Sequence, residues 1–337
     1  MNWITLTVFF VVVFTASLVG TGVVLSVFRN RAIFDHPNER SSHSRPTPYG
    51  GGIAVIIVLT LAWAVIGIQE AALLSQVMTV ISCAFFLAAV SWYDDLHGLL
   101  PLVRLLAQAI VIAVVLISTP FHGSYFADLL PSVIDLLAAG FLWLWFVNLF
   151  NFMDGIDGIA GVETACIGTG IVMAAGIAGL DGTVSLLALT VAAAALGFLC
   201  WNWHPAKIFL GDVGSVPLGF LLGWLLLSLA ASGQWAAALI LPLYYLADST
   251  ITISHRLLRG EKVWQAHRQH YYQRAVQRGL SHAAVVRVIC LTNLLLMVLA
   301  GLAASGLVWM ALAAAAVTTA ALLAFLGGWG QAAPAGK

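Results

Sequence analysis

Charge is what this 337-residue sequence has least of. Only 8% of its residues are charged, whereas 61% are hydrophobic, and its formal net charge is zero. A soluble globular domain carries far more polar surface than this composition supplies. A neutral chain also exerts no long-range attraction on nucleic acid. We therefore expect a protein that sits in a lipid bilayer and has no nucleic-acid partner.

Cysteine is scarce as well. Each of the four cysteines lies in an apolar stretch, and no two show the C-x-x-C spacing of zinc sites and redox motifs (Cys83, Cys166, Cys200 and Cys290). Isolated thiols in apolar surroundings behave as small hydrophobic groups. We expect unlinked cysteines that bind no metal.

Long apolar runs make up most of what is present. About 20 apolar residues are needed to cross about 30 Å of hydrocarbon, and such runs span as helices unless they alternate as barrel strands do. None alternates. We expect an all-α polytopic membrane protein, a single domain over residues 1–337. It would have about eleven transmembrane helices, near 3–28, 51–69, 74–93, 102–118, 133–150, 159–179, 183–200, 214–231, 234–253, 284–304 and 307–326.

Basic residues predict how these helices are oriented. If the first long connection is cytoplasmic, all 14 Lys and Arg fall on the cytoplasmic side and the opposite connections hold none. This asymmetry is the positive-inside pattern. We expect a periplasmic N-terminus and a cytoplasmic C-terminus. The first apolar run has no basic start and is too long for a cleaved signal, so we expect it to be retained.

Polar side chains gather in five connections that this orientation places in the cytoplasm: 29–50, 91–101, 148–158, 201–215 and 254–283. A transporter would carry its ionisable groups near the middle of the bilayer instead. Their position at one face indicates an active site at the interface. Such a site suits a substrate that is part lipid and part water-soluble.

Paired or glycine-flanked aspartates occur in three of these connections. Asp94 and Asp95 end one apolar run, Asp154 and Asp157 stand in "NLFNFMDGIDGIAG", and Asp212 stands in "FLGDVGS". Several carboxylates on one face repel each other unless a cation lies between them. Mg²⁺ held by one or two carboxylates and by phosphate oxygens is a common arrangement. The pattern predicts a site for Mg²⁺.

The last connection supplies complementary groups. Arg268 offers a planar fork for a phosphate, and His267 and His270 share a face if the segment is helical. Acidic groups for a metal and basic groups for phosphate together indicate phosphoryl transfer.

Each residue also has a plainer interpretation. Asp157 can cap the helix that follows it, and Asp212 can belong to an ordinary turn. Asn148 and Asn151 can form hydrogen bonds between helices. Asp248, within the ninth apolar run, requires a partner because an unpaired charge there is costly.

Taken together, the polar stretches resemble the polyprenyl-phosphate N-acetylhexosamine-1-phosphate transferases, a family that includes the phospho-MurNAc-pentapeptide translocase. "DHPNERSSHSRPTPYGGG" resembles the family's first cytoplasmic loop, and "DDLHGLLPLVRLLAQ" its aspartate pair followed by Arg and Gln. "NLFNFMDGIDGIAG" matches N-x-x-N-x-x-D-G-x-D-G, and "IFLGDVGSVPLG" matches G-D-x-G-S. The resemblance extends over residues 34–282.

One stretch departs from the family pattern. "AHRQHYYQR" has Tyr272 and Gln273 where histidines are common. It is similar to the branch that initiates O-antigen repeats with N-acetylated sugars such as FucNAc or QuiNAc. The resemblance leaves the sugar undecided among these and GlcNAc.

The resemblance implies an activity, a location and a cofactor. The reaction joins the sugar-1-phosphate of a UDP-N-acetylaminosugar to undecaprenyl phosphate and releases UMP, which initiates O-antigen or other lipopolysaccharide synthesis. It takes place at the cytoplasmic face of the bacterial inner membrane. The implied cofactor is Mg²⁺, for which Mn²⁺ can substitute. Direct attack, a covalent aspartyl intermediate, and a homodimer all stay open.

Site residues follow from the same resemblance. The expected catalytic residues are Asp94, Asp95, Asp157, His267, Arg268 and His270. The expected substrate-binding residues are His43, Arg45, Asn148, Asn151, Asp154 and Lys207. The expected metal ligands are Asp212 and Asn151.

Two other functions are alternatives. A polytopic transporter or lipid flippase would also have many spans, but it needs polar residues deep in several of them. A CDP-alcohol phosphotransferase would need an Arg and further acids after its D-G motif, and these follow neither Asp154 nor Asp157.

Overall fold

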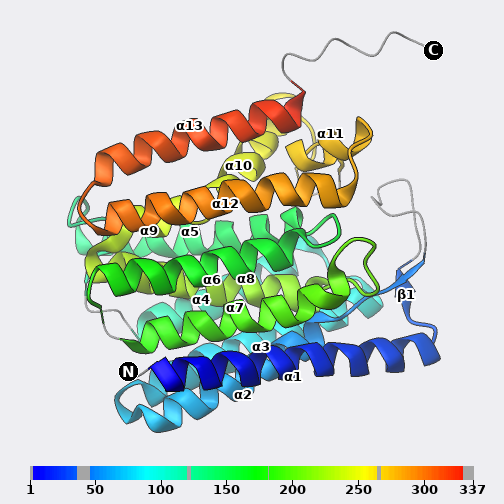
Figure 1. Cartoon of the computed structure of the whole chain (residues 1–337), viewed down its shortest axis with the longest axis horizontal. Coiled ribbons are helices and arrows are strands. Elements are labelled where there is room, and N and C mark those ends of the chain that lie inside the picture. The colour runs from blue at the N-terminus through cyan, green and yellow to red at the C-terminus, as the bar shows by residue number, and fades with distance from the viewer. Residues whose placement is uncertain (1–2, 36–45, 120–122, 181, 264–266, 329–337) are drawn as a thin grey trace.

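The chain folds into a bundle of long helices packed side by side (Figure 1). The structure is a computed structural model and describes residues 3–35, 46–119, 123–180, 182–263 and 267–328. Its α-helices are α1 (Trp3–Asn30), α2 (Gly52–Gln69), α3 (Leu74–His97), α4 (Pro101–Ser118), α5 (Ser132–Met153), α6 (Ile159–Ile177), α7 (Gly182–Asn202), α8 (Asp212–Leu229), α9 (Trp235–Ile240), α10 (Leu243–Leu258), α11 (Tyr271–Gln277), α12 (His282–Ala304) and α13 (Val308–Gly327).

Three short elements complete the described chain. Strands β1 (Phe34–Asp35) and β2 (Thr47–Pro48) form a two-stranded antiparallel sheet. A 3₁₀ turn, η1 (Ala71–Leu73), precedes α3, and a π-helical turn, η2 (Ala230–Gln234), follows α8. In the described residues, ten helical stretches are long and apolar enough to cross a membrane. The predicted all-α polytopic fold is confirmed.

The ninth predicted span is where the structure differs from the expected eleven. At Gly233 the backbone adopts a φ of 87°, a left-handed conformation that glycine adopts readily, and the chain turns there into α9. At Pro242 the helix breaks again, because proline lacks an N–H and its ring collides with the preceding turn. The expected helix over 234–253 is therefore two helices, α9 and α10. The ten long stretches include Asp212–Ile240 as one.

Helix α8 lies at the centre of the bundle. In the most apolar part of the stretch from Asp212 to Ile240, 94% of the residues are buried, whereas in that of α1 only 22% are buried. The outer helices instead expose apolar side chains such as Val12, Ile110, Phe141 and Leu291. That distribution suits a surface in contact with lipid, where burial of apolar groups carries no advantage over exposure. The central position of α8 places its first residue, Asp212, among several neighbouring helices.

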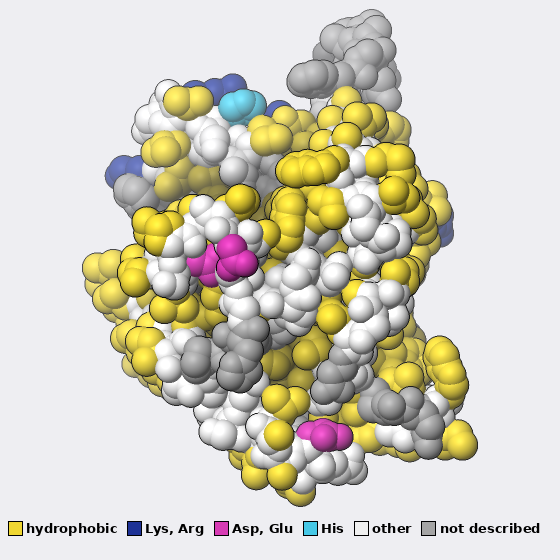
Figure 2. Space-filling model, turned by 90° about the vertical axis from the view of Figure 1, so that its left-hand side faces the viewer, with side chains coloured by type: hydrophobic (Ala, Val, Ile, Leu, Met, Phe, Trp, Pro, Cys, Tyr) yellow, Lys and Arg dark blue, Asp and Glu magenta, His cyan; other side chains and the backbone are white. Residues whose placement is uncertain are grey.

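Polar and basic groups lie at one end of the bundle. Helix α1 begins at the left of Figure 1 and α13 ends at the right. The left-hand end shows acidic side chains at two places, and Lys and Arg only along its edge (Figure 2). Arg29 and Arg104 lie at the opposite end, where α1 ends and α4 begins. Which end faces the cytoplasm stays a prediction.

Backbone pairing at that basic end fixes the loop before Asp212. The N–H groups of Gly50 and Gly51 donate to the Phe209 carbonyl at 3.1 and 2.9 Å, and the Gly52 N–H donates to the Leu210 carbonyl at 2.9 Å. A Cβ added at Gly52 would lie 2.2 Å from the Gly214 Cα. Only glycine allows α2 and α8 to approach this closely.

We expect Gly52→Ala to lower the thermal unfolding temperature. The added methyl group meets backbone atoms, which cannot rotate away, and such overpacking costs about 1–3 kcal/mol. Gly176→Ala is the control, because a Cβ at Gly176 meets nothing within 4 Å. Unfolding of both variants in detergent would be followed by intrinsic fluorescence. Equal unfolding temperatures would contradict the close contact.

Candidate active site

Arg104 connects two acidic loops. Its Nη1 donates a hydrogen bond of 2.9 Å to Asp94 Oδ2 at the end of α3, and it lies 3.9 Å from Asp212 Oδ2 at the start of α8. The other Asp94 oxygen accepts the Leu99 N–H at 2.6 Å, which closes the turn between α3 and α4. One guanidinium therefore holds carboxylates from two distant segments of the chain at a single place.

Asn151 bonds to the other carboxylate oxygen of Asp212. Its Nδ2 donates to Asp212 Oδ1 at 2.9 Å and to Ser215 Oγ at 2.8 Å, which links the end of α5 to the first turn of α8. Asn148, three residues earlier, donates to Gln108 Oε1 on α4 at 2.7 Å. The two asparagines thus form hydrogen bonds between helices and also line the acidic site.

Two further carboxylates belong to the same cluster. Asp95 interacts electrostatically with Asp94 and Asp212, and its buried Oδ2 has no hydrogen-bond partner among the described residues. Asp154, at the end of α5, is half-buried. Burial first, and then the charges of Asp212 and Asp157, raise the pKa of Asp154 to about 7. Close carboxylates with a single arginine among them would be stabilised by a further cation.

Asp157 has different surroundings from Asp154. Its Oδ2 lies 2.6 Å from His204 Nδ1 and accepts the Ala206 N–H at 3.1 Å, while its Oδ1 lies 3.3 Å from His282 Nδ1. Burial alone would raise the pKa of Asp157, but hydrogen bonds from His282, His204 and the Ala206 N–H together lower it below its usual value. Asp157 does not cap α6, which begins after Gly158. It joins the loops after α5 and α7 to the start of α12.

The two clusters would suit different metals. Asp157, His204 and His282 are the one group in the described chain with three ligand atoms within 4.8 Å of one another. Its nitrogen-rich donors are typical of transition metals, but they already bond to one another. The cluster around Asp212 offers only oxygen donors, with the unpartnered Asp95 Oδ2 among them. Oxygen donors fit Mg²⁺, which retains water and phosphate ligands and needs no complete protein cage.

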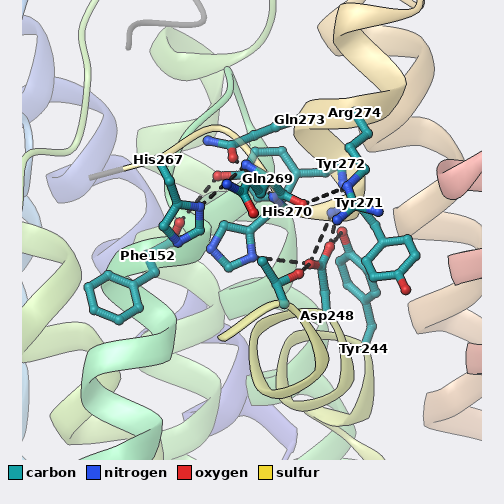
Figure 3. Close-up of polar contacts among 11 residues, drawn as sticks. Phe152, Tyr244, Asp248, His267, Gln269, His270, Tyr271, Tyr272, Gln273 and Arg274 are labelled. Carbon is teal, nitrogen blue, oxygen red and sulfur yellow. Dashed lines mark hydrogen bonds and ion pairs between the residues drawn. The ribbon is translucent and has the colours of Figure 1, made fainter. Parts of the chain in front are cut away.

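Asp248 lies in the interior of the bundle, on α10, and is fully buried. His270 Nδ1 lies 3.1 Å from Asp248 Oδ1, and the N–H groups of Tyr271 and Tyr272 donate to this carboxylate at 3.0 and 3.4 Å (Figure 3). The expectation that Asp248 is paired is therefore confirmed. The partner is the first turn of α11, which follows the basic loop.

The other residues of that loop lie close to His270. The His267 and His270 rings stack with their centres 4.8 Å apart. Burial first, and then the proximity of His270 and Arg256, lower the pKa of His267 to about 4. His267 is thus neutral near pH 7. The Arg268 carbonyl accepts a hydrogen bond from Gln277 Nε2 at 2.8 Å.

Of three further residues expected to bind substrate, one contacts a tryptophan ring and two cannot be placed. The Lys207 ammonium lies 5.1 Å from the centre of the Trp201 ring, a cation–π contact on an exposed loop. His43 and Arg45 lie outside the described residues.

Several polar groups of the site have no place among the expected site residues. Arg104 and Gln108 are one helical turn apart on α4, and that i, i+4 spacing in "RLLAQ" puts both on one face. His204 and His282 lie 47 and 125 residues from Asp157, too far apart for any local pattern to reveal. Ser215 belongs to the G-D-x-G-S stretch, which is the sequence signal for it.

A cavity of about 160 Å³ opens beside this cluster, between α3, α4, α5 and α8. Its lining includes apolar side chains, namely Leu87, Val90, Leu105, Phe152 and Val216. It also includes polar side chains, namely Ser91, Asp94, Arg104, Gln108, Asn148, Asn151 and Asp212. Such a mixed lining suits a ligand that has both a hydrocarbon chain and an anionic group.

Comparison with known proteins shows the family of this chain. Residues 77–230 match the model of glycosyl transferase family 4. The chain is 30% identical over 321 residues to the probable undecaprenyl-phosphate N-acetylglucosaminyl 1-phosphate transferase of Bacillus subtilis, covering 90% of this chain and 87% of that relative. This chain belongs to glycosyl transferase family 4, among the polyprenyl-phosphate hexosamine-phosphate transferases.

Two more distant relatives carry related names. The decaprenyl-phosphate N-acetylglucosaminephosphotransferase of Mycolicibacterium smegmatis is 28% identical over 304 residues, 76% of this chain and 71% of that protein. The phospho-N-acetylmuramoyl-pentapeptide-transferase of Streptococcus gordonii is 28% identical over 246 residues, 67% and 73% of the two chains. The family resemblance expected from the motifs is confirmed. The matched region of this family 4 protein contains the acidic cluster, whereas the loop around His270 follows it.

We expect Asp157→Asn to destabilise the protein more than Asp95→Asn does. The first change removes the charge that pairs with two histidines and weakens three hydrogen bonds, at a cost of about 1–3 kcal/mol. The second removes a carboxylate whose Oδ2 has no partner. Thermal unfolding at pH 7.5 would compare the two. Equal unfolding temperatures would show that Asp157 does not hold the loops together.

The raised pKa of Asp154 predicts a pH-dependent stability. The folded protein keeps a proton up to about pH 7 that the unfolded chain releases near pH 4. This group therefore lowers the free energy of unfolding as pH rises through that range, by at most about 1.4 kcal/mol per pH unit, and adds nothing further above it. The substituted asparagine does not titrate, so we expect the free energy of unfolding of Asp154→Asn minus that of wild type to increase between pH 5 and pH 7. Unfolding in EDTA tests this, and a constant difference would contradict it.

Proposed function

We propose that the protein transfers an N-acetylaminosugar-1-phosphate from a UDP-sugar to undecaprenyl phosphate, which gives a lipid-diphosphate sugar and UMP. The proposal places this reaction at the cytoplasmic face of a bacterial inner membrane. Its product would initiate O-antigen or another surface polysaccharide.

The position of Arg104 carries the proposal. It lies between Asp94 and Asp212 in the lining of a cavity that has both polar and apolar side chains. A guanidinium there can bind a phosphate through two parallel hydrogen bonds. Gln108 and Asn148, which bond to each other between α4 and α5, add further polar groups to this lining. The isoprenoid chain of the acceptor would lie against Leu87, Leu105 and Val216.

The acceptor needs little activation. Its terminal phosphate, with a second pKa near about 6, is mostly dianionic at pH 7. Its oxygen attacks the phosphorus attached to the sugar, and the bond from that phosphorus to the oxygen of UMP breaks. The harder task is to hold two anionic groups in line. Asp94 and Asp95 would position the acceptor and take up any proton that it still carries.

The acidic cluster would hold the divalent cation. Asp212 and the Asn151 side-chain oxygen are the proposed ligands, and Asp154 would orient the nucleotide beside them. Mg²⁺ bound there would neutralise the diphosphate of the donor. The oxygen-only donor set fits this ion.

The basic loop would bind the donor phosphates. Arg268 brings a permanent charge. His267, which is neutral, would contribute a hydrogen bond without charge. His270 would complete this side of the site, with His43, Arg45 and Lys207 as further phosphate contacts. Asp157 would act by holding the loops on which these groups stand.

The proposal is tested by incubating purified protein with undecaprenyl phosphate, a panel of UDP-N-acetylaminosugars and Mg²⁺. Mass spectrometry of the lipid and measurement of UMP identify the product and the preferred sugar. We expect EDTA to abolish UMP release and Mg²⁺ or Mn²⁺ to restore it. Asp212→Asn should reduce release by at least about 100-fold, since it removes charge that the transition state needs.

Glu70→Gln is the matched control, because Glu70 is an exposed acid at the other end of α2. It should retain full activity. Full activity of Asp212→Asn would remove Asp212 from the metal site. Movement of a substrate across the membrane without any covalent product would favour a transporter, and activity with a CDP-alcohol would favour the other phosphotransferase class.

A further inference from the structure

Tyr272 connects the basic loop to the acidic cluster through one hydrogen bond. Its hydroxyl donates to the Phe152 carbonyl at 3.2 Å, two residues before Asp154. A Cβ added at Gly155 would lie 2.2 Å from the Tyr272 hydroxyl oxygen. The tyrosine therefore contacts residues both before and after Asp154 in this turn. The ring itself is fully buried.

The hydroxyl is a reliable donor. Burial first, and then the nearby carboxylates of Asp248 and Asp154, raise the pKa of Tyr272 well above its usual value. The phenol thus keeps its proton near pH 7. A histidine of similar position could donate only in one of its tautomers.

Asp248 fixes the other end of this linkage. It accepts the Tyr271 and Tyr272 N–H groups at 3.0 and 3.4 Å, and His270 Nδ1 lies 3.1 Å from it. Tyr244 and Thr252, on its own helix, add hydroxyl donors at 3.3 Å. A buried carboxylate is tolerated only when donors surround it in this way. Asp248 therefore ties the first turn of α11 to α10.

Ring stacking adds a contact between His270 and Tyr272. The His270 and Tyr272 rings lie 5.7 Å apart at an angle of 14° (Figure 3). His270 Nε2 has no partner among the described residues, so the ring is held by Asp248 and by its neighbours His267 and Tyr272. The order of contacts is Asp248, the first turn of α11, Tyr272, and the Phe152 carbonyl. The turn at Asp154 follows directly.

We propose that Tyr272 and Asp248 are positioning residues that set where Asp154 lies relative to Asp212. This inference rests on the proposed function, since it assigns Asp154 to the phosphate side of the site. Neither residue needs to touch the substrate. Loss of the linkage would leave the helices intact and let the turn at 152–155 move.

Tyr272→Phe tests this linkage most directly, because it removes the hydroxyl oxygen that bonds to Phe152 and keeps the ring. A hydrogen bond is worth about 0.5–1.5 kcal/mol net, so kcat should fall by about 2- to 13-fold. KM for both substrates should stay within about twofold, since no substrate contact is lost. Tyr271→Phe is the matched control. That tyrosine is the neighbouring residue on α11, and its ring lies 5.0 Å from the Arg274 guanidinium instead.

A double-mutant cycle tests whether Asp248 acts through Tyr272. Asp248→Asn should lower kcat by more than Tyr272→Phe does, because it weakens several of the contacts at once. If both residues act on the same turn, the double variant should be no slower than Asp248→Asn alone, within about twofold. If kcat of the double variant fell by the product of the two single losses, Asp248 would have a separate, purely structural role. That result would overturn its part of the inference.

Hydrogen exchange provides a readout that does not depend on activity. In Tyr272→Phe the backbone amides over 152–158 should exchange about 2- to 13-fold faster than in wild type, the factor that corresponds to one hydrogen bond. In Tyr271→Phe they should not change. Equal exchange in the two variants, or equal kcat, would refute the linkage. An inactive wild-type protein would refute the proposed function alone, and the exchange experiment would still decide the inference.

Discussion

Mutual repulsion of carboxylates at the end of an apolar bundle is the constraint on which the site depends. Asp94, Asp95, Asp154 and Asp212 come from three connections and interact electrostatically at one place. Arg104 is the cation that the described structure places directly among them. A guanidinium offsets part of this repulsion, and the proposed divalent ion would offset more of it.

Three acids at or near the basic end of the bundle are stabilised in three ways. Asp212 bonds to an asparagine and lies near an arginine, Asp157 bonds to two histidines, and Asp248 accepts N–H groups from the first turn of α11. Each joins segments far apart in sequence, because the donors for each come from more than one element. The same bonds that stabilise the charges therefore also assemble the loops.

Hydrophobicity predicted most of the fold correctly because a helix that faces lipid must be apolar over its whole length. The prediction failed at Pro242, inside the expected helix over 234–253, where the hydropathy stays high while the backbone cannot continue as one helix. Apolar character reports the surroundings of a segment, and it does not report its backbone geometry. The family's motifs likewise indicated the loops whose acids the structure brings together.

The sequence by itself determined the class of protein, the end of the bundle at which its polar groups lie, and its family. Composition and local spacing are sufficient for these, since each depends on residues close together in the chain. Only the tertiary structure decided which acids face one another. Asp154 and Asp157 are three residues apart and alike in sequence, yet one joins the acidic cluster and the other bonds to His204 and His282. Their partners come from elsewhere in the chain, and only packing brings them together.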